Sequence, residues 1–229
     1  MVDIKVKLEA PGAEVKYVKS TPYYFKAASL EIRGNQISLP KRAATTVEFN
    51  ANSNLKELVD MTTDIAITDK QLTVDSVYNL LHGTDEFGKL RNFMGARMDQ
   101  MRYSKMKGFL IRPQKNAKNI IQTKEEYEKI YYYSKQIAID SDADFYGLTF
   151  PSNIPKGDIE DIWNNYVINR NSGDPYPIIF LDPSNEDFEK FQSLIPYLKV
   201  HIDSGHFNLF GTYHTGNGHF SSILRCQGI

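Results

Sequence analysis

The sequence contains one cysteine, Cys226, among its 229 residues, so it can form no disulfide within the chain. A lone thiol is typical of a protein in a reducing compartment, and we therefore expect a cytoplasmic location. The chain also lacks a long uninterrupted apolar run. Its first residues alternate charged and apolar side chains, which predicts neither a signal peptide nor a membrane-spanning helix. We expect no membrane partner.

The sequence also has no excess of one charge. Its 27 basic residues are balanced by 28 acidic ones, so the chain as a whole has no attraction for nucleic acid or anionic membranes. Hydrophobic residues make up 41% of the sequence, with 14 Tyr and 13 Phe, a composition that favours a packed globule over a disordered chain. The length suits one large domain or a main domain with a small appendage.

Several common catalytic motifs are missing. The sequence has no phosphate-binding G-x-x-x-x-G-K-[ST], no G-x-G-x-x-G after a strand, no G-x-S-x-G and no C-x-x-C. These absences argue against P-loop nucleotide hydrolases, dinucleotide oxidoreductases, serine hydrolases and thiol redox proteins. The sequence indicates neither a cofactor nor an oligomeric state.

The first part of the chain is predicted to be rich in β-structure. Apolar residues alternate from Val2 to Asn50, with turn residues between the runs. The clearest element is a hairpin of residues 25–32 and 37–39 around Gly34, and a further strand is expected near residues 45–49. We divide the chain into a β-rich part, residues 1–55, packed on a main α/β domain, residues 56–229.

The next segment predicts mixed elements. A short helix is expected within residues 52–61, a short buried strand at 64–68 and a helix at 74–82, interrupted by Gly83. A longer helix then begins near residue 84 or 85 and ends at Gly108. Its apolar residues recur at steps of three and four and should share one face; they are Phe87, Leu90, Met94, Met98 and Met101.

After this helix the pattern becomes regular. Short apolar runs at 109–111, 145–150, 177–181 and 200–202 alternate with amphipathic helices that begin after residue 123, at residue 158 and after residue 184. Thr123 and Glu126 have the spacing of a capping box, and the helix that follows them should carry on one face Tyr127, Ile130, Tyr131, Ser134 and Ile137. Alternation of this kind is typical of βαβ units in a parallel sheet. We therefore predict an α/β fold in which a β-rich N-terminal part precedes successive βα units. The simple succession of units favours a β/α-barrel-like arrangement or a partial barrel, and an open α/β sheet is the alternative. Residues 207–214 are either one more strand or a loop.

Ligands of parallel α/β sheets bind at the carboxyl ends of the strands. The residues that follow the four predicted strands are therefore the candidate site. We expect Asp182 and Asp203 as base or nucleophile and His206 as acid or base, and the candidate ligand-binding residues there are Arg112, as an anion clamp, Asn153 and Asn185. The same residue types are also common where helices begin, so a purely structural role remains an alternative.

Four of the five histidines, His201, His206, His214 and His219, lie in the last 29 residues, close to Asp203. Imidazole and carboxylate groups can hold a divalent metal. Their spacing matches no compact zinc pattern, however, and the segment is rich in glycine. We therefore predict no metal site.

Basic residues are concentrated between Lys89 and Lys118, where nine Lys or Arg accompany a single acidic residue. Arg97 and Arg102 in this stretch are further candidate ligand-binding residues, for contact with phosphate. Such a segment can bind the phosphates of a nucleotide or of nucleic acid. Alternatively, its long side chains cover the flank of a solvated helix.

Two functions follow from these patterns. The first is a barrel-type enzyme that binds a small polar ligand, containing a phosphate or a nucleoside, at the carboxyl ends of its parallel strands; two carboxylates would suit glycosyl-bond chemistry. The second is a non-catalytic binding or assembly protein, which uses the basic 89–118 surface or the β-rich N-terminal part to contact a partner such as nucleic acid.

Overall fold

The computed structural model describes residues 65–83, 85–169 and 173–181. It also describes residue 171, two short helical segments at 190–194 and 196–197, a strand at 210–212, and the backbone of several strands between residues 7 and 45. The predicted helix at 52–61 and the predicted strand at 200–202 lie outside the described residues.

The N-terminal part forms an antiparallel sheet of four strands in the order β1-β2-β3-β4. The strands are β1 (Lys7–Ala10), β2 (Ala13–Ser20), β3 (Lys26–Ile32) and β4 (Asn35–Leu39). The predicted hairpin is confirmed, since β3 pairs with β4 across a turn in which Gly34 has a φ of 80°. This left-handed conformation is one that glycine adopts without strain.

The main domain contains a six-stranded sheet in which all neighbours run parallel. Its order, β10-β9-β8-β7-β6-β5, follows the chain. The strands are β5 (Ala44–Thr45), β6 (Ile65–Leu72), β7 (Met106–Pro113), β8 (Phe145–Thr149), β9 (Tyr176–Leu181) and β10 (Phe210–Thr212). The predicted α/β fold is confirmed, and closure into a barrel stays a prediction. Strand β5 joins this sheet ahead of the predicted domain boundary at residue 55, and the boundary itself stays a prediction.

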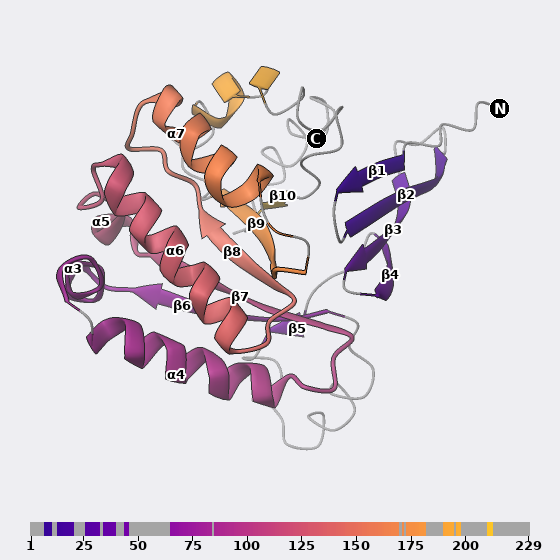
Figure 1. The fold of residues 1–229 in the computed structure, drawn as a ribbon, viewed down its shortest axis with the longest axis horizontal. Helices are drawn as coiled ribbons and strands as arrows, with labels where there is room; N and C mark the ends of the chain where they lie inside the picture. Colours follow the sequence, from indigo (N-terminus) through magenta and orange to yellow (C-terminus); the bar gives the residue numbers. More distant parts are fainter. Residues whose placement is uncertain are drawn as a thin grey trace.

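Helices connect the strands. They are α3 (Val74–His82), α4 (Asp85–Gln100), α5 (Lys115–Lys118), α6 (Lys124–Asp140) and α7 (Lys156–Trp163), which continues into the π-helix η1 (Asn164–Ile168). Figure 1 shows α4, α6 and α7 following one another along the same side of the sheet. This arrangement is what right-handed crossovers produce when the strand order follows the chain.

Local sequence determines where these helices begin. Thr123 precedes α6 and accepts a hydrogen bond from the Glu126 backbone N–H, while the Glu126 carboxylate accepts one from the Thr123 N–H. This capping box, predicted from the sequence, satisfies two backbone donors that the first helical turn leaves without partners. Thr73 caps α3 in a similar way through the Ser76 N–H.

The predicted end of the long helix at Gly108 is wrong. Helix α4 ends at Gln100, and Gly108 lies within strand β7. A Cβ atom at Gly108 would lie 2.4 Å from both the ring and the carbonyl oxygen of Phe145 on the neighbouring strand. Glycine is therefore required here by the close approach of β8 and not by a helix terminus.

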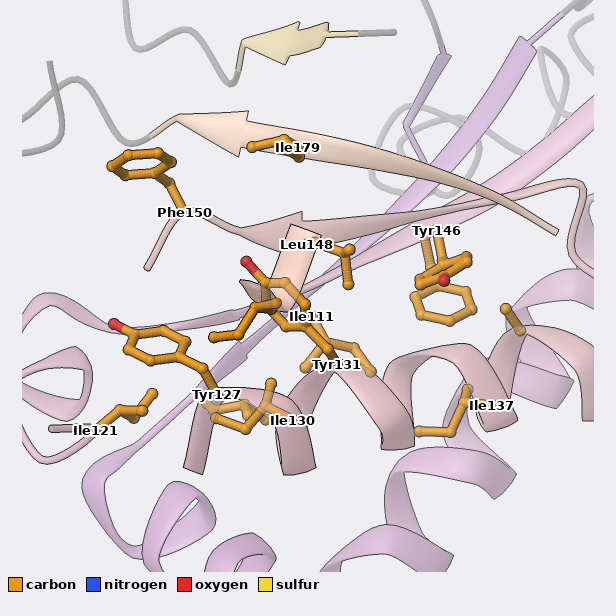
Figure 2. Packing of buried hydrophobic residues seen from close by; sticks show 14 of the residues in the cluster. Ile111, Ile121, Tyr127, Ile130, Tyr131, Ile137, Tyr146, Leu148, Phe150 and Ile179 are labelled. Atoms are coloured by element: carbon orange, nitrogen blue, oxygen red, sulfur yellow. The ribbon is translucent and has the colours of Figure 1, made fainter. Parts of the chain in front are cut away.

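The main core lies between the sheet and its helices. Figure 2 shows Tyr127, Ile130, Tyr131 and Ile137 of α6 directed toward apolar side chains of the sheet. All members of the predicted α6 face are buried, as are most apolar residues of the predicted α4 face. The helical periodicity thus identified the surfaces that pack on the sheet. The largest fully buried side chain in the described part of the chain is Trp163 of α7.

Candidate functional site

The carboxyl ends of β6, β7, β8 and β9 lie beside one another, because these strands are adjacent and parallel. Arg112 is the penultimate residue of β7, and Asn153 follows β8. Asp182 follows directly after the last residue of β9 in the sequence. Asp182, Asn185, Asp203 and His206 lie outside the described residues. Their predicted roles at this end of the sheet stay predictions.

Arg112 is held by two residues of the neighbouring strand β6. Its Nε and Nη2 donate to Asp69 Oδ2 over 3.0 and 2.9 Å. The amide of Gln71, oriented so that its oxygen faces the guanidinium, accepts from Nη1 at 3.0 Å and from Nη2 at 2.8 Å. These three residues form a network, which we call the β6–β7 polar group. Within this group, Asp69 and Gln71 occupy the two edges of the Arg112 guanidinium that carry paired N–H donors.

The β6–β7 polar group lies on the sheet face that points away from the helices. Gln71 is in register with Arg112, and Asp69 is in register with Leu110, so all four side chains share one face. The alternating residues Phe109 and Ile111 belong instead to the core beneath the helices. The Arg112 and Asp69 side chains keep 22% and 32% of their exposure, so solvent reaches both.

Apolar residues occupy the same face nearer the amino ends of the strands. Met106 and Leu110 of β7 are each 1% exposed, and Phe145 of β8 is 4% exposed. Tyr176, which is in register with Phe145, is also buried. On β6 and β7 the face therefore changes from apolar at the amino ends to polar at the carboxyl ends. This is the distribution expected of a sheet with a ligand site at its carboxyl edge.

The carboxyl end of β8 is fixed by hydrogen bonds from both sides. Tyr131 Oη on α6 donates to the Thr149 carbonyl over 2.6 Å, and Thr149 Oγ1 donates to the Ile111 carbonyl over 3.3 Å. In the loop that follows, Lys190 Nζ donates to the Ser152 carbonyl over 2.9 Å. A loop held in this way is a rigid support for the edge of a site.

Asn153, a predicted ligand-binding residue, also connects two loops. Its Nδ2 lies 2.8 Å from the Lys118 carbonyl oxygen and 3.2 Å from that of Ile121. These contacts join the loop after β8 to the end of α5 and to the segment between α5 and α6. The amide nitrogen thus orders the rim, and a direct contact of Asn153 with ligand stays a prediction.

The basic segment of residues 89–118 is distributed over several elements. Arg91 pairs with Asp140 at 2.9 Å, and Lys107 lies 3.6 Å from Asp142. Arg112 pairs with Asp69, as described above. The carboxylates come from outside the segment, so much of the excess positive charge seen in the sequence is balanced in the folded chain.

The two arginines proposed for phosphate contact lie at the end of α4 and in the turn that follows. Arg97 stacks over the ring of Phe93 at 5.0 Å from its centroid and donates to Gln100 Oε1 over 2.7 Å. Arg102 lies 4.9 Å from the ring centroid of Tyr103 and is exposed. Both precede β7, whereas Arg112 lies near the carboxyl end of that strand.

Shifted pKa values occur near α7. Burial raises the pKa of Tyr197 to about 12, assisted by the nearby charge of Glu160, while the hydrogen bond to Asn164 acts in the opposite direction. Tyr197 Oη lies 3.0 Å from Asn164 Oδ1 and 3.3 Å from the Glu160 carbonyl oxygen. Burial also raises the pKa of Tyr166. These tyrosines belong to the helical layer and not to the strand-end site.

Within the part of the chain that the structure describes, no group of three or more His, Cys, Asp or Glu residues could hold a metal ion. The four C-terminal histidines lie outside that part. No described helix is both long enough and apolar enough to cross a membrane.

Comparisons with known proteins add no assignment. No protein-family model, curated protein or solved structure matches the chain.

Sequence reasoning found Arg112 but missed Asp69 and Gln71. Both lie within residues 64–72, where a buried strand was expected only as far as residue 68. Strand β6 continues to Leu72. The available signal was the alternation of Thr68, Lys70 and Leu72 with Asp69 and Gln71, which places the two polar residues on one face of an extended strand.

Proposed function

We propose that this protein is a barrel-type enzyme that binds a small polar ligand, containing a nucleoside or a phosphate, at the carboxyl ends of its parallel strands. The observation that carries this proposal is the β6–β7 polar group. It places a cation, a carboxylate and an amide next to one another at the sheet edge where parallel α/β proteins bind ligands.

The position of this group supports a binding role over a purely stabilising one. Partly exposed ion pairs contribute little to stability. Even a buried ion pair can often be replaced by well-packed apolar residues without a loss of stability. The neighbouring part of the same face is lined by Met106, Leu110 and Phe145. A face that is apolar elsewhere has no packing need for Asp69 and Arg112, so a ligand is the better reason for their presence.

The chemical step is proposed for residues that follow the neighbouring strands. Asp182 and Asp203 would serve as base or nucleophile, and His206 as acid or base. Asn153 and Asn185 would orient the ligand. Glycosyl-bond chemistry on a nucleoside would suit two carboxylates placed on opposite sides of the bond.

A thermal-shift screen tests the binding step. The purified protein is heated with nucleosides, nucleotides, sugar phosphates and short oligonucleotides, because a ligand that binds the native state raises the melting temperature. The test variant is Arg112→Met. Its control is Lys124→Met, which removes a cation of similar exposure that lies 2.8 Å from Asp161 on the helical side.

The proposal predicts that a small polar ligand raises the melting temperature of the wild type and of Lys124→Met, but not of Arg112→Met. Equal shifts in all three proteins would contradict a site at the strand ends. A shift with oligonucleotides alone, lost when Arg97 and Arg102 are both changed to Glu, would favour the binding-protein function and reject the enzyme.

A further inference from the structure

The guanidinium of Arg112 faces its own protein on both forked edges. Asp69 takes the Nε and Nη2 edge, and Gln71 takes the Nη1 and Nη2 edge. A phosphate could make the usual bidentate contact with Arg112 only by displacing one of these residues. The geometry therefore gives Arg112 the role of holding Asp69 and Gln71 in place.

Asp69 and Gln71 retain hydrogen-bonding capacity beyond Arg112. Both contacts from the guanidinium end on Asp69 Oδ2, and no described residue donates to Oδ1. The Gln71 oxygen accepts from the guanidinium, which directs its Nε2 and the two N–H groups on it away from Arg112. An acceptor and a donor are thus held side by side, because both residues share contacts with Nη2 of the same arginine.

The charge of the group also matters. The positive charge of Arg112 is balanced by Asp69 at 2.9 Å, so the pair has no net charge to attract a phosphate dianion. Asp69 would repel the oxygens of a phosphate that approached its free side. A neutral ligand edge that carries both an N–H donor and an acceptor matches the group in hydrogen bonding and in charge.

We infer that Asp69 and Gln71 recognise an uncharged edge with adjacent donor and acceptor groups, of the kind that a nucleobase presents, and that Arg112 is their positioning residue. This inference rests on the proposed function and narrows it. Of the two ligand parts considered there, the β6–β7 polar group binds the base, and any phosphate is bound elsewhere.

The decisive variant is Gln71→Glu. A glutamate at this position still accepts from Arg112, and adds an ion pair, but it has no N–H donor for the ligand. The fold should therefore be retained while base recognition is lost. If Gln71 served only to stabilise the fold, the variant should bind the base as well as the wild type or better, because the glutamate adds a charged partner for Arg112.

Calorimetric titration measures the effect with guanosine, adenosine, cytidine, uridine, ribose 5-phosphate and inorganic phosphate as ligands. We expect at least one nucleoside to bind the wild type and to bind Gln71→Glu and Asp69→Asn about tenfold more weakly or worse, the effect of one lost hydrogen bond in a site. Asp161→Asn, which removes an ion pair on the helical side, should bind like the wild type. Inorganic phosphate should not compete with the nucleoside.

The outcomes separate this inference from the proposed function. Nucleoside binding that Arg112→Met abolishes but Gln71→Glu and Asp69→Asn leave intact would overturn base recognition and keep the strand-end site. Binding of ribose 5-phosphate or phosphate in preference to every nucleoside would also overturn it. Binding that none of the three variants affects would reject both proposals, as would the absence of binding by every compound.

Discussion

The two faces of the parallel sheet differ in what their side chains do. The face under α4, α6 and α7 is covered by a continuous apolar core, which includes Tyr127, Phe150 and Trp163. On β6 and β7 the opposite face is apolar toward the amino ends and carries Asp69, Gln71 and Arg112 toward the carboxyl ends. The comparison suggests that the helical face supplies stability and that the opposite face supplies the site.

The largest predicted effect concerns the helical face. Trp163 is fully buried, and its ring lies 5.8 Å from that of Phe150. Replacing it with alanine should lower the free energy of unfolding by about 3–5 kcal/mol, because a large cavity remains in the core. Urea denaturation measures this change. A loss below about 1 kcal/mol would show that the helical layer is not the main source of stability.

A second change tests the contact between β7 and β8. The Cβ of Gly108→Ala would lie 2.4 Å from the carbonyl oxygen of Phe145, a backbone atom that cannot rotate away. We expect a loss of about 1–3 kcal/mol from overpacking. Gly157→Ala is the control, because a Cβ there meets no atom within 4 Å. Equal denaturation midpoints for the two variants would contradict the close approach of the strands.

The third prediction concerns the link between the helical layer and the site. Tyr131→Phe removes the hydrogen bond from Oη to the Thr149 carbonyl, which is 2.6 Å long and buried. Stability should fall by about 0.5–1.5 kcal/mol, the usual net value of such a bond. Tyr132→Phe, at an exposed neighbouring position, should have no measurable effect in the same denaturation experiment. Similar losses in both variants would argue against a specific role of Tyr131.

The fourth prediction concerns the β6–β7 polar group itself. Breaking the pair with Asp69→Asn should cost no more than about 1 kcal/mol, because both side chains are partly exposed. This small loss would sharpen the contrast between the faces, since the same variant is expected to weaken ligand binding about tenfold. A much larger loss of stability would mean that the group is structural.

The last prediction concerns the dependence of stability on pH. Tyr197 has a pKa raised from 10.0 to about 12, so the folded state holds its proton more tightly than the unfolded state. Its stabilising contribution is complete below pH 10 and is lost as the pH rises through the folded pKa. Between pH 10 and pH 12, Tyr197→Phe should therefore lose less stability than the wild type. Denaturation midpoints at several alkaline pH values test this, and parallel curves for the two proteins would contradict it.

The sequence was most informative about the helical face. Helical periodicity identified the buried side of α6, and the spacing of Thr123 and Glu126 placed its start, because both patterns depend on contacts within one helix. The succession of strands and helices also predicted the α/β fold. These features are local, so a single sequence contains the physical information that determines them.

The end of α4 and the β6–β7 polar group were harder to predict. Gly108 was interpreted as the end of a helix, but its conformation is determined by Phe145, which lies on another strand. Arg112 was expected to bind an anion, and its partners Asp69 and Gln71 are about forty residues away in the sequence. Contacts between distant residues depend on strand order and register, which a single sequence does not encode in any local pattern.

The most direct test of the account is a nitrogen-15 NMR titration of the protein with the nucleoside that binds best. The account predicts that the amide signals of Gln71, Thr73, Gln114 and Ser152, at the carboxyl ends of β6, β7 and β8, move on binding. The signals of Lys107, Asp144 and Tyr176, at the amino ends of the strands, should stay in place. Changes confined to the amino ends would contradict a ligand site at the carboxyl ends of the sheet.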